Sequence, residues 1–302
     1  MIFYNKISLK SRIVSTFRHH FNTINLMKKT FTILVFIFAF QCLLFSQEDK
    51  KYFYLNWGYN RSAYTKSDIN FSGKGYQFTL NSVVAKDRQT PLNRENLFGT
   101  YLNIKYLSIP QYNLRIGKRV SERWAFSVGT DHMKYVMVTD QVVKIEGEIA
   151  AQVSSPSIDT KQYAGKYTGQ DIKLSPDFLR FEHTDGYNVV SIDADRYINL
   201  YREDEKHFSL VATIGAGISM VVPRSDVHLF DVGANHNWNI SGEGAVVKTS
   251  LQLHFNKRIF LEMVGKSGFT YLHAIPTTGQ KGDKATQGIG YIEGIIQLGF
   301  KL

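Results

Sequence analysis

The C-terminal stretch of the chain alternates between apolar and polar side chains with a period of two residues. Between Gly288 and Leu302, the apolar positions are Ile292, Ile296, Leu298, Phe300 and Leu302, and the polar residues Glu293, Gln297 and Lys301 lie between them. A period of two places successive side chains on opposite faces of a strand. The stretch is therefore predicted to be a β-strand with one apolar and one polar face.

The same alternation recurs through most of the chain after residue 50. Seven further segments show it: residues 51–60, 111–119, 124–135, 187–200, 208–222, 245–255 and 259–275. Beyond residue 45 there is no run of the roughly 18 apolar residues that a membrane helix needs. If this part of the chain crosses a membrane, its strands must close into a barrel, because lipid offers no partners to an unpaired backbone group.

The connections between these segments alternate in length. Residues 121–123, 202–206 and 256–258 form short connections, whereas residues 61–108, 139–186, 223–242 and 276–287 form long ones. Bacterial outer-membrane barrels have short periplasmic turns and longer extracellular loops. We therefore predict an all-β fold, a membrane-spanning antiparallel up-and-down β-barrel of eight strands with both ends on the periplasmic side.

The two largest loops are too long to be plain connections and are predicted to carry structure or function. Residues 75–80 alternate as a strand does, but a ninth spanning strand would reverse the orientation of every later turn, so we assign them to structure inside the first loop. Residues 91–96 are predicted to form a short helical turn, and residues 142–149 and 178–183 to extend strands above the membrane.

The N-terminal region has the features of a secretory signal peptide. Lys28 and Lys29 precede an apolar run over residues 31–45, and a polar stretch follows Ser46. The run is short for a bilayer-spanning helix. We therefore predict that residues 1–46 are an N-terminal extension and signal peptide, with translation starting at Met27, and that residues 47–302 form the barrel domain.

Removing this region changes the charge of the chain. Residues 1–46 carry six basic and no acidic residues, so the formal net charge of +10 falls to +4 without them. The high isoelectric point is thus no argument for nucleic acid binding. The only cysteine, Cys42, lies inside the apolar run, and Gln41 occupies the position where a lipoprotein signal needs a small residue.

An eight-stranded barrel has an interior just wide enough to be filled by side chains, so an open channel is not expected. Seven charged residues lie at similar depth on the faces opposite to the apolar series of their strands: Arg115, Asp131, Asp193, Asp195, Lys248, Lys266 and Glu293. Buried charges persist mainly when they are paired. We predict a belt of paired charges across the lumen. A proton or ion relay, or a cation site formed by Asp131, Asp193 and Asp195, is the alternative, although the nearby Lys and Arg favour neutralisation.

Two groups of residues raise the alternative of a lipid-modifying enzyme. Asp131 and His132, with His183 and Asp185, are predicted to lie toward the extracellular rim on adjacent strands, and a histidine with an acid can act as a general base. No serine or cysteine nucleophile is fixed beside them by spacing. The sequence His207-Phe208-Ser209 has the spacing found in lipid A deacylases but lies at the periplasmic end in the predicted topology.

The first long loop is basic, with seven Lys or Arg and three acidic residues between positions 61 and 108. Two interpretations stay open: a solvated loop, or contact with lipopolysaccharide phosphates or another anionic ligand. Expected partners are outer-membrane lipid, lipopolysaccharide and the barrel assembly machinery. No cofactor, metal or nucleic acid is expected, and the sequence does not identify an extracellular ligand.

Several stretches look like parts of uncharacterised bacterial outer-membrane β-barrel proteins. They are residues 57–61, 75–80, 131–136, 181–186 and 222–224, which begin Trp57-Gly58-Tyr59, Gly75-Tyr76-Gln77, Asp131-His132-Met133, Phe181-Glu182-His183 and Val222-Pro223-Arg224. The resemblance covers most of the chain after the signal peptide. It implies an outer-membrane location and a barrel fold, and it brings no catalytic residues with it.

The function expected from the sequence is that of an integral outer-membrane barrel whose structured extracellular loops bind a partner or serve a structural role. A lipid A acyl hydrolase or acyltransferase using His132 or His183 is the second hypothesis; whether the chain catalyses any reaction is left open, with the balance against it. A soluble lipocalin-like barrel is the third, and it would need an apolar interior and a polar exterior.

Overall fold

The computed structural model describes residues 51–203 and 208–302, and the predicted signal peptide lies outside the described residues. Eight antiparallel strands close into a ring in which each strand pairs with the next one in the ring, and β1 pairs with β15 to complete it. The ring confirms the predicted eight-stranded barrel. Its strands are β1 (Tyr52–Tyr64), β5 (Tyr112–Arg119), β6 (Trp124–Met137), β9 (Leu179–Glu203), β10 (Phe208–Val221), β13 (Gly242–His254), β14 (Ile259–Pro276) and β15 (Lys284–Lys301).

The outer wall of the ring carries an apolar belt, because the outward positions of the strands hold large hydrophobic residues. The exposed members of the belt include Phe53, Ile116, Phe126, Val128, Ile192, Ile214, Ile218, Val247, Met263, Phe269, Ile292, Ile296 and Leu298. Along β14, the outward positions from Leu261 to Tyr271 span ~33 Å of strand at ~3.3 Å per residue. With a strand tilt of ~40°, the belt is ~25 Å tall, the height of the apolar band of outer-membrane barrels.

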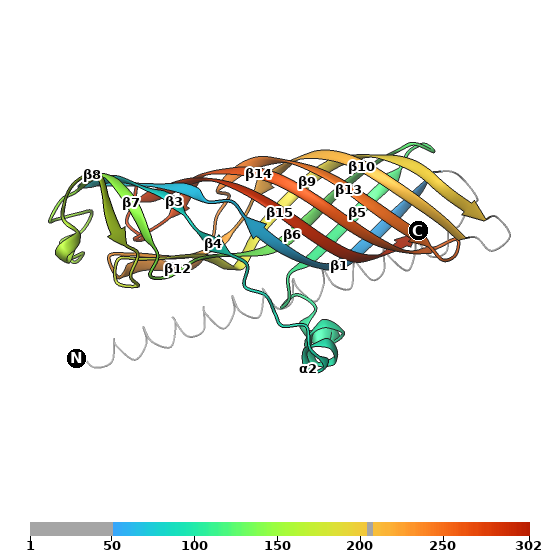
Figure 1. The fold of residues 1–302 in the computed structure, drawn as a ribbon, viewed down its shortest axis with the longest axis horizontal. Coiled ribbons are helices and arrows are strands. Elements are labelled where there is room, and N and C mark those ends of the chain that lie inside the picture. Colours follow the sequence, from blue (N-terminus) through green and yellow to red (C-terminus); the bar gives the residue numbers. More distant parts are fainter. Residues whose placement is uncertain (1–50, 204–207) are drawn as a thin grey trace, which may run out of the picture. The chain divides into compact units, whose positions relative to one another are not determined.

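The long connections continue the sheet beyond one end of the ring as an extension (Figure 1). There β2 (Ser67–Gly73) pairs with the end of β15, and β3 (Tyr76–Val83), β7 (Val142–Ile149) and β8 (Gly165–Lys173) follow in order. On the other side, β11 (Arg224–Leu229) pairs with β9 and with β12 (Val232–Trp238). The two-residue β4 (Ala85–Lys86) pairs with the end of β6.

These findings confirm that residues 75–80 belong to the first long loop and do not cross the ring, since β3 pairs only with β2 and β7. Residues 142–149 form a strand as predicted, and of the predicted segment 178–183 all residues but Phe178 belong to β9. The segment predicted as 187–200 is longer: β9 runs from Leu179 to Glu203, so a single strand belongs to the ring at one end and to the extension at the other.

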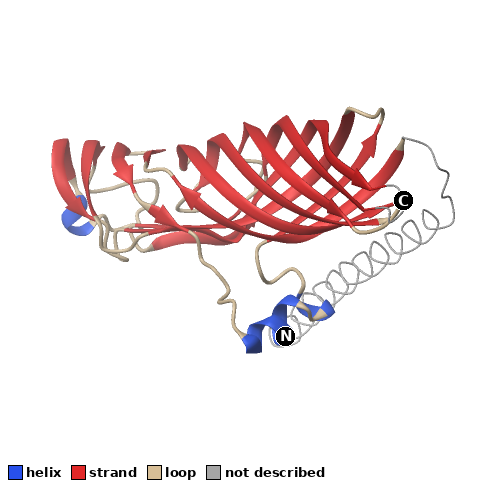
Figure 2. Cartoon of the chain, turned by 45° about the vertical axis from the view of Figure 1, so that its right-hand side comes forward, coloured by secondary structure: helices blue, strands red, loops and turns tan. Residues whose placement is uncertain are grey.

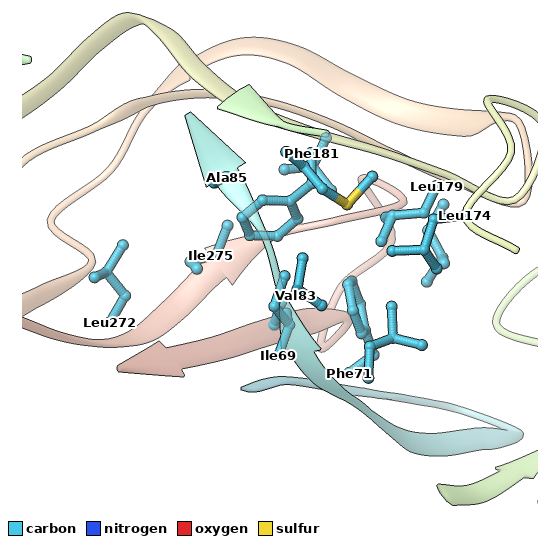
Figure 3. Close-up of a cluster of buried hydrophobic side chains, with 14 of the residues drawn as sticks. Ile69, Phe71, Val83, Ala85, Leu174, Leu179, Phe181, Leu272 and Ile275 are labelled. Atoms are coloured by element: carbon cyan, nitrogen blue, oxygen red, sulfur yellow. The ribbon is translucent and has the colours of Figure 1, made fainter. Parts of the chain in front are cut away.

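A large hydrophobic core fills the extension (Figure 3). The rings of Phe71 and Phe78 stack at 4.9 Å between centroids, and Phe178 packs 4.5 Å from Tyr163. These rings are surrounded by buried residues that include Ile69 of β2, Leu80 of β3 and Leu174, together with residues of β9 and β11. The extension is therefore a packed β-structure with its own core.

One connection leaves the sheet. After β4, the chain forms the helix α2 (Arg94–Asn96), the π-helical turn η1 (Leu97–Tyr101) and the 3-10 turn η2 (Ile104–Tyr106) before β5 begins. Figures 1 and 2 both show this segment at the side of the ring and not beyond its end. The remaining short helix, η3 (Lys161–Tyr163), lies in the extension. No helix within residues 51–203 and 208–302 is long and apolar enough to span a bilayer.

Candidate functional site

The seven charged residues predicted to face the lumen form one connected network. Arg115 pairs with Asp193 through Nη1, and its Nη2 lies 3.7 Å from Oδ1 of Asp131. From β13, Lys248 Nζ donates to Asp193 at 2.8 Å and lies 3.1 Å from Oδ2 of Asp195. Asp193 therefore lies between two cations.

Lys266 pairs with Asp131 and joins Glu293, the remaining carboxylate, to this network. Its Nζ pairs with Asp131, and it lies 3.7 Å from Oε2 of Glu293. Asn113 binds both acids from β5, donating to Asp131 at 2.6 Å and to Glu293 at 3.0 Å. The residues come from β5, β6, β9, β13, β14 and β15, so the network spans the lumen.

Strand register and small neighbours make room for these side chains. Lys266 and Glu293 are directly opposite each other on β14 and β15, and Gly215 and Gly217 of β10 are opposite Asp195 and Asp193. A Cβ at either glycine would collide with the facing carboxylate. The glycines thus allow a carboxylate to lie flat against the inner wall.

The network is buried and nearly balanced in charge. All seven residues are at most 9% exposed, and three cations face four carboxylates. Because two cations flank Asp193, and Lys248 also contacts Asp195, a hard cation would have to displace lysine or arginine from these acids. The described residues contain no group of three or more His, Cys, Asp or Glu side chains placed to hold a metal. The arrangement suits a structural plug of paired charges.

A second polar layer lies nearer to the short turns and was missed by sequence reasoning. Glu262 of β14 accepts four hydrogen bonds, from Asn56 at 2.7 Å, Ser250 at 2.5 Å, Gln252 at 3.0 Å and Gln297 at 2.7 Å. Glu262 is four positions before Lys266 on the same inward face, which is the signal that could have identified it. Its charge is stabilised by amides and a hydroxyl.

Between these two layers the lumen has a cavity of only about 20 Å³, lined by Arg115, Asp195, Glu262 and their neighbours. That volume admits roughly one water molecule. Toward the extension, Tyr135, Tyr187 and Gln287 fill the lumen: Gln287 donates to the Tyr135 hydroxyl at 2.6 Å, and the two rings lie 6.1 Å apart. The described side chains therefore fill the interior at three levels.

The predicted cluster of Asp131, His132, His183 and Asp185 is not formed. Asp131 points into the lumen, so His132, the next residue of β6, points to the outer wall, where its Nδ1 lies 2.7 Å from Oδ1 of Asn188 and its ring stacks on Tyr112. Adjacent residues of a strand face opposite sides, and an acid and a histidine at such positions cannot act on one substrate. Asp185 lies 3.5 Å from Arg224 instead.

His183 lies inside the extension and contacts a serine that the sequence did not place beside it. Its Nδ1 is 2.9 Å from Ser225 Oγ, and the rings of Phe181 and Tyr187 pack against it. Burial lowers the pKa of His183 to about 3. The side chains of this pair have almost no exposed surface, so no acyl chain reaches the Ser225 hydroxyl, and the pair is not arranged as a catalytic nucleophile and base.

The sequence His207-Phe208-Ser209 is only partly described, because His207 lies outside the described residues. Ser209 is opposite His254 where β10 pairs with β13. The residue lies at the end of the ring that carries the short turns, as the predicted topology required.

No family model matches the chain, and no curated protein matches it. Among solved structures, the outer membrane protein OprG from Pseudomonas aeruginosa aligns at a TM-score of 0.34 and 7% identity, over 83% of this chain and 95% of that chain. The outer membrane protease OmpT from Escherichia coli aligns at 0.23 and 7% over 83% and 96%, and the P. putida toluene transporter TodX at 0.13 and 7% over 85% and 91%. Such distant likenesses transfer no residue role to this chain.

Proposed function

We propose that the protein is an integral outer-membrane β-barrel with a filled lumen, and that its extension stands at the cell surface as a binding or structural element. The single observation that carries the proposal is the inverted distribution of polarity across the ring. Large apolar side chains such as Ile214, Ile292 and Ile296 are about 60% exposed on the outer wall, while Lys266 and Glu293 are buried inside. This arrangement is stable where lipid surrounds the ring.

Aromatic residues at the two ends of the belt support the same proposal. Trp124, Phe255 and Phe300 lie beside the short turns or the last residues of the chain, and Trp238 and Tyr271 lie toward the extension; all five are exposed. Aromatic girdles mark both interfaces of outer-membrane barrels. The aliphatic belt between them would then lie in the hydrocarbon layer.

The filled lumen favours a role outside the membrane over transport. The charge network, the Glu262 layer and the tyrosines together occupy the interior, and the packed extension is the largest structure beyond the ring. Loops held on a rigid scaffold are frequent sites of binding. The extension is therefore the element to which we assign a role, and β15 is the strand that we expect the barrel assembly machinery to recognise.

The other two hypotheses lack support in the geometry. A lipid-modifying enzyme needs its nucleophile and base together at the lipid surface, whereas His132 contacts Asn188 on the outer wall and His183 is enclosed in the extension. A soluble lipocalin-like barrel needs an apolar interior and a polar outer wall, which is the reverse of the observed pattern.

Cysteine labelling on intact cells tests the proposal. Variants of the chain with Cys42 replaced carry either Val142→Cys in the extension or Lys257→Cys in a short turn; both positions are exposed. A membrane-impermeant maleimide should label the Val142→Cys variant on intact cells and the Lys257→Cys variant only after the outer membrane is opened. Equal labelling of both, or a product that remains soluble and shows no heat-dependent gel mobility, would refute the proposal.

A further inference from the structure

The segment between β4 and β5, residues Asp87–Gln111, exposes several apolar side chains that are not buried in the ring or in the core of the extension. We call it the lateral segment. Phe98 is 64% exposed and Ile104 is 82% exposed. Its other exposed apolar residues are Leu92, Leu97, Leu102, Tyr106 and Ile109.

The four-stranded part of the extension formed by β2, β3, β7 and β8 does not share this property. In β2, β3, β7 and β8, only Val142 is an exposed large hydrophobic residue, and the outward positions are otherwise polar or charged. Exposed hydrophobic side chains thus gather on the belt and on the lateral segment. Contiguous apolar surface of this kind marks an interface with a partner or with lipid.

Specific contacts hold the lateral segment against the outer wall at the level of the belt. The Tyr59 hydroxyl donates to the carbonyl oxygen of Tyr101 at 2.5 Å, and their rings meet edge to face at 4.9 Å. Arg61 donates to the carbonyl oxygen of Thr90 at 2.9 Å and to the Tyr101 hydroxyl. Tyr59 is directly opposite Ile296, an exposed member of the belt.

The far end of the lateral segment is held in the same way. Lys134, on the outward face of β6, donates to the carbonyl oxygen of Ile109 at 3.0 Å. With Arg61, the outer wall thus provides two cations that bind backbone carbonyls of the segment, which fixes its height along the ring. The exposed Arg94 and Lys105 lie among its apolar residues, as basic residues do in elements that rest at a lipid surface.

We propose that the lateral segment inserts its apolar side chains among the acyl chains of the outer leaflet and anchors the barrel at that interface. The inference rests on the proposed function, because it requires the belt to lie in a membrane. Three observations identify lipid as the partner of this surface. The segment is continuous with the belt, it is attached to the wall beside Ile296, and its composition is apolar and weakly basic.

Tryptophan quenching by lipids tests the inference separately from the proposed function. The chain after the signal peptide has three tryptophans, Trp57, Trp124 and Trp238. One variant keeps only Trp124, on the belt. Two others replace all three by Phe and add either Phe98→Trp in the lateral segment or Val142→Trp in the extension, two positions with nearly equal exposure. Each is folded into vesicles of brominated phosphatidylcholine, and folding is verified by heat-dependent gel mobility.

We expect the Trp124 variant and the Phe98→Trp variant to lose fluorescence, the latter by at least half of the fractional loss of the former, and the Val142→Trp variant to lose little. If Trp124 is not quenched, the proposed function fails. If Trp124 is quenched and the Phe98→Trp variant is not, only the inference fails. Quenching of the Phe98→Trp variant that disappears at high protein-to-lipid ratio would identify a second copy as the occupant and would also overturn the inference, as would equal quenching of Val142→Trp.

Discussion

The charge network predicts that Lys266→Met is far more destabilising than the loss of an exposed lysine. Lys266 is buried between Asp131 and Glu293. Without it, Asp131 keeps Arg115 at 3.7 Å, but Glu293 loses its ion pair and keeps the hydrogen bond from the amide of Asn113 at 3.0 Å. Removing one partner of a buried ion pair costs ~3–5 kcal/mol, because the acid left behind either stays charged and desolvated or must take up a proton. We therefore expect the free energy of unfolding to fall by that amount.

The assay is reversible urea unfolding in phospholipid vesicles, followed by tryptophan fluorescence. Lys144→Met is the matched control: Lys144 pairs with Asp171 at 2.8 Å, but its side chain is 57% exposed, and an exposed pair contributes at most ~1 kcal/mol. Adding Glu293→Gln to Lys266→Met should restore much of the lost stability, since it removes the unpaired buried acid. The reasoning is refuted if Lys266→Met costs no more than Lys144→Met, or if the double variant is less stable than the single one.

Three further predictions concern the extension, the inner wall and the lumen. Burial lowers the pKa of His183 to about 3, whereas a histidine in the unfolded chain titrates near pH 6.5. Between these pH values the unfolded chain therefore binds a proton that the folded chain does not, and the free energy of unfolding should fall by ~1.4 kcal/mol for each unit by which the pH is lowered. His183→Phe should remove this slope from unfolding curves measured at several pH values. An unchanged slope would contradict this assignment. Gly217→Ala should destabilise the barrel by ~1–3 kcal/mol, because a Cβ at this position meets Asp193 and the backbone of Ile192. Gly265→Ala is the control and should be neutral, because no atom lies within 4 Å of a Cβ built there. Equal urea midpoints for the two variants would contradict the packing argument. Planar-bilayer recordings should show no steady open-channel conductance, and a stable ohmic channel would disprove the filled lumen.

The eight strands of the ring could be predicted because both of their determinants are local. A strand with one face toward lipid and one toward a polar lumen must alternate with a period of two, and each strand pairs with its neighbour in the chain through a short turn or a long loop. The alternation of short and long connections then predicted the direction of each crossing. That parity placed residues 75–80 outside the ring, and β3 lies in the extension as expected.

The pairings within the extension could not be predicted, because they join segments far apart in the chain. β3 pairs with β7, and Tyr76 lies opposite Ile149; nothing in either segment specifies the other. The lateral segment shows the same limit. The sequence predicts a helical turn over residues 91–96. The attachment of the lateral segment to the outer wall, however, depends on Tyr59, Arg61 and Lys134, which come from other parts of the chain.

The two-residue period of a strand also decides which of the candidate site residues can lie on the same face. It placed Asp131 in the lumen, and the same rule puts His132 on the outer wall, so the cluster with His183 could have been excluded from the sequence. Glu262 was accessible by the same count from Lys266. What the rule cannot supply is the set of contacts across the lumen: Arg115 and Asp193 belong to strands separated by β6, and their pairing depends on the curvature of the closed ring.

Along β9, the apolar face and the polar face of the strand exchange sides between the ring and the extension. Between Leu179 and Tyr197 its odd positions, with the exception of the exposed Asp185, are buried on the inner face. They change from the charged Asp193 to the apolar Phe181, while the even positions change from the exposed Ile192 to the charged Glu182. In the ring, the apolar outer wall and the polar interior suit lipid as the surroundings. In the extension, the apolar interior and the polar exterior suit water as the surroundings. If the barrel lies in a membrane, the outer boundary of the hydrocarbon layer falls near Tyr187 and Asn188, where the two patterns meet. A lipid-quenching scan of single tryptophans along the even positions should therefore lose its signal between Ile192 and Glu182, and a signal that continued past Glu182 would separate the change of polarity from the membrane boundary.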